Sequence, residues 1–329
     1  MVVVDCNIEH VGFYKKLRDK TAVPGVKPAR LNEDGRLYGS LSSRNEIDLR
    51  LGTEGFVDEG DGDKFESIFD YLKKTNPKGS YLQDVIDADF ISNRRILMQF
   101  AKSAYVLERL EIKAVRRHGV IFLCDTKKYT DNWGAPYPYG YKFEQCMTLD
   151  DNGEPHDRYA KVSNDECTKG ICRATLSSEN EKIRMFYVAE LDAMDSDGNF
   201  VEMKTTTQTF QKWLKYSSLD NYLQSYLGKV QHIIYGHKKS HEEQVVYKVD
   251  KVPLDELPKH VNKNRDKRFI WNLEKCLEKL FSILQGLQSE LQFDDDAVTV
   301  QITKEGVFYE RENPDCLDSM ISMFAGYFD

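Results

Sequence analysis

The sequence predicts an α+β fold in which twisted, mixed β-sheets are flanked by helices. Aromatic residues make up 12% of the 329-residue chain, with 18 Tyr and 17 Phe, and such side chains are enriched in strands. Hydrophobic residues make up 40%, which is enough for a substantial core. Strand and helix patterns alternate without an intervening linker. We therefore expect one domain, residues 1–329, with residues 1–30 as a variable N-terminal segment.

The first half of the chain mixes irregular structure with short periodic elements. The stretch up to about Gly62 is rich in Gly, Asp and Arg and is expected to wrap a core without regular structure. The segment DKFESIFDYLKK predicts a helix with one apolar stripe, formed by Phe65, Ile68, Phe69 and Leu72. A second helix is expected from about Asp84 through ISNRRILMQFAK. LEIKAV and VIFLCD flank the turn RRHG and predict a β-hairpin.

The second half contains the most informative pattern, between Ile183 and Thr207. IRMFYVAELDAM and NFVEMKTTT both have a β pattern, and the SDG between them predicts that the two strands pair antiparallel. FQKWLKYSSLDNYLQSYL then predicts a helix, VQHIIYG a strand, and RFIWNLEKCLEKLFSILQGLQSEL a long amphipathic helix. The chain is expected to end in the strand AVTVQI and an aromatic tail.

Composition narrows the classes of protein. A net charge of −8 argues against a general nucleic-acid coat protein, but leaves room for an enzyme with a local basic groove. With no long apolar run and no basic leader, we expect no membrane segment and an intracellular location, in the nucleus or cytoplasm. Seven scattered cysteines without a CxxC pair indicate reduced thiols. His237 and His241 are interpreted as part of a solvated loop rather than a metal site.

Four charged residues in the hairpin segment suggest metal chemistry. Side chains two apart on a strand share a face, so Glu190 should align with Asp192, and Glu202 with Lys204. Carboxylate oxygens are the ligands that Mg²⁺ and Mn²⁺ prefer. Two such ions, about 3.5–4 Å apart, can drive phosphodiester hydrolysis, with a Lys to neutralise charge on the phosphate. The alternative is an exposed hairpin whose acids and Lys simply face water.

An ordered set of motifs favours the catalytic alternative. GYKFE ends at Glu144, upstream of E-x-D and E-x-K, and a helix with Gln224 and then YGHKK follow downstream. This order resembles the DXO family of RNA decapping nucleases and 5′-3′ exoribonucleases. The resemblance extends from about Arg30 to about Leu291, and includes DGRLYG, IDLRLG, DFISNRRIL and VSNDECTKGICR. Each motif alone is weak, whereas the ordered set is specific.

The resemblance implies a PD-(D/E)xK-related nuclease core. It also implies metal-dependent removal of incomplete or non-standard caps, including NAD caps, and 5′→3′ degradation of RNA. The metal ligands would be Glu144, Asp192, Glu202 and the main-chain carbonyl of Met203, holding Mg²⁺ or Mn²⁺. Glu190 would act through metal-bound water, while Lys204 and Gln224 would position the nucleophile and the scissile phosphate.

The resemblance also marks candidate RNA contacts, with weaker support. They are Arg36, Glu66, Asn93, Arg94, Arg95 and Lys169 in the TKG turn, besides Glu190, Lys204 and Gln224. Arg36 and Glu66 are equally well read as surface or helix-face charges. Arg94, next to Arg95, would by default lie on a solvated basic helix face, but the motif match favours a phosphate contact. Gln224 could be a satisfied buried amide, but a functional role is favoured.

Departures from the family pattern leave substrate preference open. The family has aromatic-Arg-Gly where this chain has Asn93-Arg94-Arg95, and Gly-x-Arg where it has Gly236-His237-Lys238. Lys gives up the bidentate phosphate fork of Arg. A catalytically weak 5′-end RNA-binding or regulatory protein is therefore the main rival hypothesis, and a DNA nuclease is a third. An acidic chain without coiled-coil heptads predicts a monomer, and the sequence identifies no protein partner.

Overall fold

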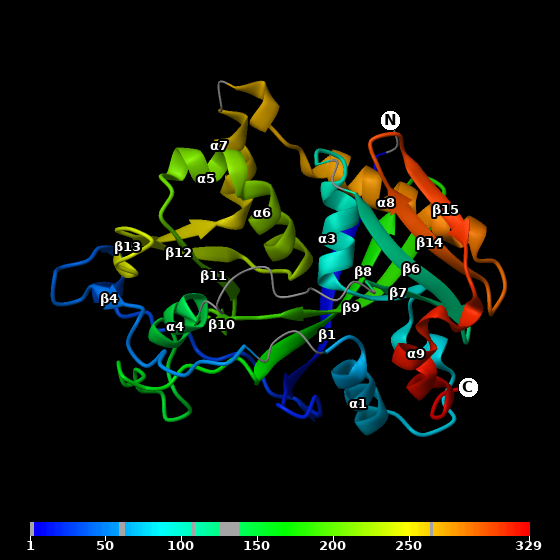
Figure 1. The fold of residues 1–329 in the computed structure, drawn as a ribbon, viewed down its shortest axis with the longest axis horizontal. Helices are drawn as coiled ribbons and strands as arrows, with labels where there is room; N and C mark the ends of the chain where they lie inside the picture. The colour runs from blue at the N-terminus through cyan, green and yellow to red at the C-terminus, as the bar shows by residue number, and fades with distance from the viewer. Residues whose placement is uncertain (1–2, 59–62, 107–108, 126–137, 264–265) are drawn as a thin grey trace.

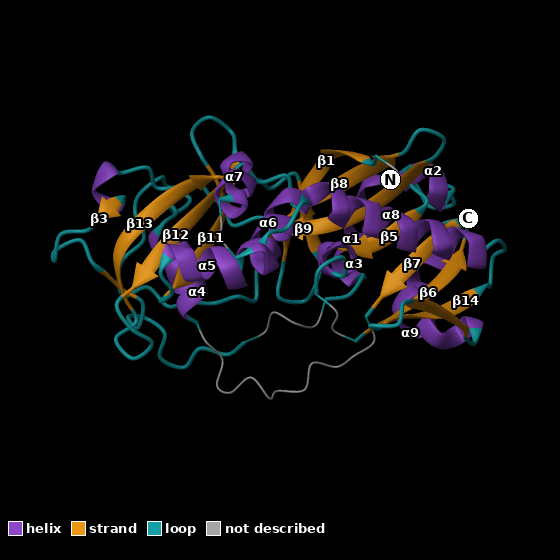
Figure 2. Cartoon of the chain, turned by 90° about the horizontal axis from the view of Figure 1, so that it is seen from above, coloured by secondary structure: helices purple, strands orange, loops and turns teal. Residues whose placement is uncertain are grey.

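The computed structural model describes residues 3–58, 63–106, 109–125, 138–263 and 266–329. Within these ranges the chain forms two mixed β-sheets with helices packed on their faces (Figure 1). Figure 2 shows the two sheets side by side, with α6 (Ser218–Leu227) between them in that view. The predicted class, an α+β fold of twisted mixed sheets, is confirmed. No helix of the described ranges has the length and apolar character needed to cross a membrane.

The larger sheet has nine strands in the order β15-β14-β6-β7-β5-β9-β8-β1-β2. β5 runs parallel to both of its neighbours, and the other pairs are antiparallel. Its strands are β1 (Asp5–Lys16), β2 (Ala22–Pro24), β5 (Phe90–Asn93), β6 (Leu110–Arg117), β7 (Val120–Cys124), β8 (Cys167–Ser177), β9 (Lys182–Glu190), β14 (Ala297–Ile302) and β15 (Val307–Arg311).

The smaller sheet contains the predicted E-x-K strand, β11, between β10 and β12. β11 pairs parallel with β12 and, over two residues, antiparallel with β10. The strands are β3 (Gly39–Ser40), β4 (Ile47–Asp48), β10 (Ala193–Met194), β11 (Phe200–Thr206), β12 (His232–Lys238) and β13 (Val245–Pro253).

The helices cover both faces of both sheets. One face of the larger sheet packs against α3, α6 and α8, and its other face packs against α1, α2 and α9. On the smaller sheet, α5 and α7 lie over one face and α4 over the other. The helices are α1 (Glu66–Thr75), α2 (Leu82–Ile86), α3 (Arg94–Lys102), α4 (Tyr139–Cys146), α5 (Phe210–Tyr216), α6, α7 (Leu257–Asn262), α8 (Leu273–Glu290) and α9 (Asp318–Ala325).

Several predicted elements are present. The β6–β7 hairpin turns at His118 and Gly119, both with positive φ, as a tight two-residue turn requires. α1 buries Ile68 and Leu72 with the preceding Phe65, and α8 buries most of its leucine stripe. The segment predicted as one helix carrying Gln224 is instead α5 and α6, which meet at Ser217.

Two predictions in the first half are wrong. The stretch before Gly62 is not all irregular, because β1 is a 12-residue strand paired along its length with β8. The expected helix from Asp84 to Lys102 is interrupted by β5, a buried strand between α2 and α3. Both strands lie inside the larger sheet, so the site rests on elements that the sequence pattern did not indicate.

Candidate metal-dependent nuclease site

Glu202 and Lys204 project from the same face of β11, as predicted. Glu202 is buried, with 1% of its surface exposed, and its carboxylate contacts the Lys204 ammonium. The parallel partner β12 supports this strand from one side. A buried carboxylate is costly unless a cation and hydrogen-bond donors compensate it, and Lys204 supplies the first of these.

Two helices bring further donors to Glu202. On α6, Gln224 donates its Nε2 hydrogen to Glu202 Oε1 at 2.7 Å. At the start of α3, Arg94 donates from Nη1 to the main-chain oxygen of Gln224 at 3.2 Å, and the same nitrogen lies 3.7 Å from Glu202 Oε2. The Arg94 side chain is 12% exposed, so the prediction that places it at a site fits better than a solvated basic face.

Asp192 reaches the same place by a route that differs from the prediction. Glu190 ends β9 in the larger sheet, whereas Asp192 lies in the connection to β10 of the smaller sheet. The expected pairing of two long antiparallel strands is therefore wrong, since only Ala193 and Met194 pair with β11. Asp192 Oδ2 accepts a hydrogen bond from the main-chain N of Met203 at 2.6 Å. This bond fixes Asp192 beside Glu202, while the metal-binding role of the Met203 carbonyl stays a prediction.

Glu144 lies on α4, which packs against the face of the smaller sheet that is opposite to α5 and α7. Phe143, its neighbour on the helix, is fully buried in the cluster formed by β11, β12 and β13. Gly236 on β12 makes this contact possible, because an added Cβ would lie 2.8 Å from Phe143 Cε2. The strand's glycine thus sets how closely α4, and with it Glu144, approaches the sheet.

Gly236→Ala should therefore destabilise the protein and disturb the Glu144 position. Overpacking of this kind costs about 1–3 kcal/mol of unfolding free energy. The measurement is urea denaturation of the variant beside Gly198→Ala, a turn glycine whose Cβ would meet open space but whose φ of 84° adds backbone strain alone. Because Gly236 has no positive φ, a Gly236→Ala protein as stable as the wild type would show that the Phe143 contact has no effect of its own.

Mutual repulsion and burial change the protonation of the cluster. Burial, followed by the charges of Glu190 and Glu202, raises the pKa of Glu144 to about 8. Burial, followed by the charges of Glu202 and Glu144, raises the pKa of Asp192 well above its ordinary value. For Lys204, burial alone would lower the pKa, but the charges of Glu202 and Asp192 outweigh it and the pKa rises. The geometry collects more negative charge than one lysine neutralises.

The donor set fits a hard divalent cation. Glu202 Oε2 is buried without a hydrogen-bond partner, and three carboxyl groups repel one another across a short span. Among the residues that the structure describes, no three His, Cys, Asp or Glu side chains already stand at ligand spacing. Lys204 and Gln224 both bond to Glu202 Oε1, which leaves Oε2 as the carboxylate oxygen without a hydrogen-bond donor.

In the absence of metal, the free energy of unfolding should fall as the pH rises. The pKa of Glu144 is about 8 when folded, against an ordinary value of 4.5, so the folded chain holds this proton more tightly. The stability that the protonated Glu144 contributes is complete below pH 4.5 and is lost as the pH rises through 8. Urea midpoints in chelator should therefore fall over this range, and Glu144→Gln should flatten the slope. A midpoint that rises with pH in both proteins would contradict the charge assignment.

A cavity of about 550 Å³ opens beside the carboxylates. Glu144, Glu190 and Asp192 line it, together with Lys27 and Arg30. These basic residues were not predicted as site residues, because they lie in the segment expected to be variable. Their only signal is proximity in sequence to the start of the family resemblance at about Arg30. A cavity lined by both carboxylates and cations suits a phosphate ester held against a metal.

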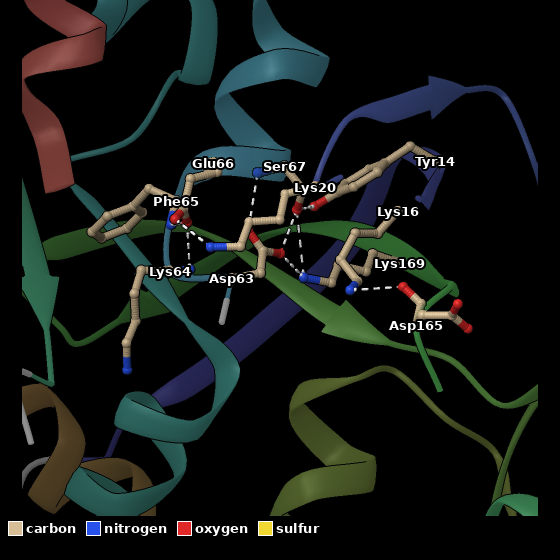
Figure 3. A network of polar contacts seen from close by, with 10 residues as sticks. All are labelled: Tyr14, Lys16, Lys20, Asp63, Lys64, Phe65, Glu66, Ser67, Asp165 and Lys169. Atoms are coloured by element: carbon tan, nitrogen blue, oxygen red, sulfur yellow. Dashed lines mark hydrogen bonds and ion pairs between the residues drawn. The ribbon is translucent and has the colours of Figure 1, made fainter. Parts of the chain in front are cut away.

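The remaining predicted RNA contacts have other partners in the structure. Arg36 is exposed and pairs with Asp34 at 2.5 Å. Glu66 accepts from Lys20 Nζ at 2.8 Å and from the main-chain N of Lys64 at 2.7 Å, so it serves the start of its own helix (Figure 3). Among the residues described, no hydrogen bond or ion pair connects Arg36 or Glu66 to the carboxylate cluster. Their RNA roles stay predictions.

Two further positions differ from the expected local structure. Lys169 lies within β8 rather than in a turn, and its ammonium contacts Asp63. His237 lies in β12 rather than in a loop, with its Nε2 2.9 Å from Asp250, whereas His241 is exposed beside Thr207.

Asn93 and Arg95 flank Arg94 at the start of α3. Asn93 is the N-cap of α3, because its side chain accepts from the main-chain N of Ile96 at 3.0 Å. That bond explains why Asn is suitable there whether or not RNA contacts it. Arg95 is exposed.

Comparison with known proteins agrees with this geometry. A family model described as "RAI1 like PD-(D/E)XK nuclease" matches residues 26–315. The decapping nuclease dom-3 of Caenorhabditis elegans is 30% identical over 278 residues, which cover 79% of this chain and 68% of that protein.

Two solved structures share the fold. Candida albicans Rai1, in complex with pU5-Mn²⁺, superposes with a TM-score of 0.73 at 15% identity, covering 98% of this chain and 92% of that one. Scheffersomyces stipitis Rai1, in complex with (3′-NADP)⁺ and calcium, has a TM-score of 0.73 at 16% identity, covering 96% and 94%. The chain belongs to the RAI1-like PD-(D/E)XK nuclease family, the DXO family that its motifs resemble.

Proposed function

We propose that this protein hydrolyses modified RNA 5′ ends with the help of divalent metal. The observation that carries the proposal is the convergence on Glu202 of Lys204, Gln224 and Arg94, with Asp192 and Glu144 close enough that the Glu202 charge raises the pKa of both. A relative with 30% identity is a decapping nuclease, and two proteins of the same fold form complexes with pU5-Mn²⁺ and with (3′-NADP)⁺ and calcium.

Each residue of the site has a separate proposed role in the reaction. Glu144, Asp192, Glu202 and the Met203 carbonyl would hold Mg²⁺ or Mn²⁺, in a pair as the two-metal pattern predicts. When bound, such ions polarise the scissile phosphate and lower the pKa of a bound water. Glu190 orients that water, Lys204 neutralises charge developing on the phosphate, and Gln224 fixes the phosphate's position. Lys27 and Arg30 attract the rest of the 5′ end into the 550 Å³ cavity.

The substrate would be an incomplete or non-standard cap, NAD caps included, with 5′→3′ degradation of the released RNA as a further step. The Scheffersomyces stipitis Rai1 complex with (3′-NADP)⁺ supports an NAD-like end. An RNA substrate of this kind fits the expected location in the nucleus or cytoplasm. One domain, acting as a monomer, stays our prediction for the whole chain.

A panel of defined RNAs tests the proposal. Transcripts with GpppA, methylated cap, NAD or a 5′ monophosphate are incubated with the protein in Mg²⁺, Mn²⁺ or chelator, with Glu202→Gln in parallel. Metal-dependent release of a cap fragment by the wild type alone supports the enzyme and identifies its substrate. RNA binding without cleavage of any transcript favours the regulatory RNA-binding alternative, and equal cleavage of DNA favours a DNA nuclease.

A further inference from the structure

Three residues stand side by side on neighbouring strands that lead to the candidate site. Tyr14 on β1 is directly opposite Lys169 on β8, and Lys169 is directly opposite Glu190 on β9. Directly opposed residues of antiparallel strands project from the same face, with Cβ atoms about 4.5–5.5 Å apart. The long side chain of Lys169 is therefore within reach of Glu190.

Lys169 does not make that ion pair. Its ammonium contacts Asp63, and it also lies 3.4 Å from Ser67 Oγ (Figure 3). The side chains of Asp63 and Lys169 are 5% and 12% exposed, so the pair is largely shielded from water. In the described part of the chain no ion pair joins Lys169 to Glu190, and the lysine is turned toward α1 instead.

Asp63 is itself fixed by the beginning of α1. Its Oδ1 accepts from the main-chain N of Ser67 at 3.0 Å, and its Oδ2 accepts from Ser67 Oγ at 2.5 Å. Ser67 Oγ is in turn 2.8 Å from the hydroxyl of the fully buried Tyr14. If the Asp63 carboxylate moved toward β9 together with Lys169, its hydrogen bonds to Ser67 would break.

Glu190 remains accessible as a result. It lines a cavity of about 330 Å³ together with Lys169 and Asp63, and it also lines the larger cavity beside Asp192 and Glu144. A direct pair with Lys169 would draw the Glu190 carboxylate away from Asp192 and Glu144, which line the larger cavity with it.

We propose that Asp63 is a positioning residue that holds the Lys169 ammonium away from Glu190, leaving the Glu190 carboxylate available to the reaction. This inference rests on the proposed function for its catalytic consequence, but not for the contact it describes. Loss of the Asp63 charge would leave Lys169 buried without an acid, and Glu190 is the acid opposite it in the sheet. A charge-assisted hydrogen bond between these two would then compete with the role of Glu190.

Activity of three variants tests the consequence. Asp63→Asn should lower kcat roughly tenfold or more with little change in KM, because substrate binding is kept while Glu190 is sequestered. Adding Lys169→Gln to Asp63→Asn should restore kcat substantially, because no ammonium remains to capture Glu190. Asp70→Asn is the matched control, because Asp70 on α1 accepts from the main-chain N of Ala22 and pairs with Lys74, and within the described residues no hydrogen bond or ion pair joins it to Lys169 or Glu190. A double variant as slow as Asp63→Asn, or slower, would overturn the inference.

Stability measured in chelator tests the contact without any need for activity. Glu190→Gln should lower the melting temperature more in the Asp63→Asn background than in the wild type, because only there does Glu190 pair with Lys169. Lys169→Gln should remove that difference. An equal effect of Glu190→Gln in all backgrounds would refute the proposed contact even in an active enzyme. Conversely, coupling seen in a protein that cleaves no RNA would uphold the contact and reject only the proposed function.

Discussion

Glu202→Gln should lower the rate of RNA 5′-end hydrolysis by about 10³-fold or more, the scale expected when several kcal/mol of metal-derived stabilisation is lost. The amide keeps the size of the side chain and can still accept from Lys204 and Gln224. It loses the charge that a divalent cation requires, and its second polar atom becomes an N–H donor aimed toward Arg94. Single-turnover cleavage of an end-labelled substrate at saturating Mg²⁺ or Mn²⁺ measures the effect, and calorimetric titration of Mn²⁺ measures the lost affinity.

The matched control for Glu202→Gln is Glu310→Gln, the same change at an exposed position of the edge strand β15. It should cleave at the wild-type rate. If Glu202→Gln also cleaves at that rate, Glu202 holds no essential metal and the site lies elsewhere. If Mn²⁺ affinity falls but the rate does not, the ion bound at Glu202 is structural rather than catalytic.

The sequence alone predicts how the β11 residues of the site are arranged, because the alternation of side chains along a strand depends only on neighbouring residues. Glu202 and Lys204 share a face for this reason alone. Which partners meet them is decided by tertiary packing. Gln224 and Arg94 arrive on two helices separated by 130 residues of chain, and only the ordered motifs indicated that they belong together.

The Glu190–Asp192 pair shows where alternation misleads. Both residues were expected on one strand that pairs with β11 along its length. Instead the chain leaves the larger sheet after Glu190 and enters the smaller one at Ala193, with Asp192 in the crossing. An E-x-D spacing has the same appearance in a continuous strand and in one that changes sheets. The prediction of convergence could therefore succeed although the predicted pairing was wrong.

The two missed strands have different physical reasons. β1 exposes one face, so Asp5, Asn7 and Glu9 give it the polarity of a loop, while the buried positions include a lysine, Lys16. β5 is four residues long and runs parallel between β7 and β9, buried on both faces. Buried parallel strands lack alternation, and so short an apolar run next to a helix cannot be separated from it by period.

Lys204→Met should show that this lysine compensates the same charge as the metal does. In chelator the variant should lose about 3 kcal/mol of unfolding free energy, because Glu202 is buried and its nearest cation is gone. Saturating Mn²⁺ should narrow the gap to the wild type, since an ion that binds only the folded state adds stability in proportion to its occupancy. The cleavage rate should still fall about 10²-fold, because Mn²⁺ does not replace the donor directed at the phosphate.

Urea denaturation of both proteins with and without Mn²⁺ separates these two roles of Lys204. Lys251→Met is a suitable control, because Lys251 pairs at 3.1 Å with Asp195, another buried carboxylate, that also accepts from the main-chain N of Asn199. Lys251→Met should lose the same unfolding free energy with and without Mn²⁺, since Asp195 is not among the expected metal ligands. If the difference in unfolding free energy between the wild type and Lys204→Met is the same with and without Mn²⁺, the cation does not approach Glu202. The charge of Glu202 would then be compensated by Lys204 and Arg94 without an ion, and the metal-dependent mechanism would lose its structural basis.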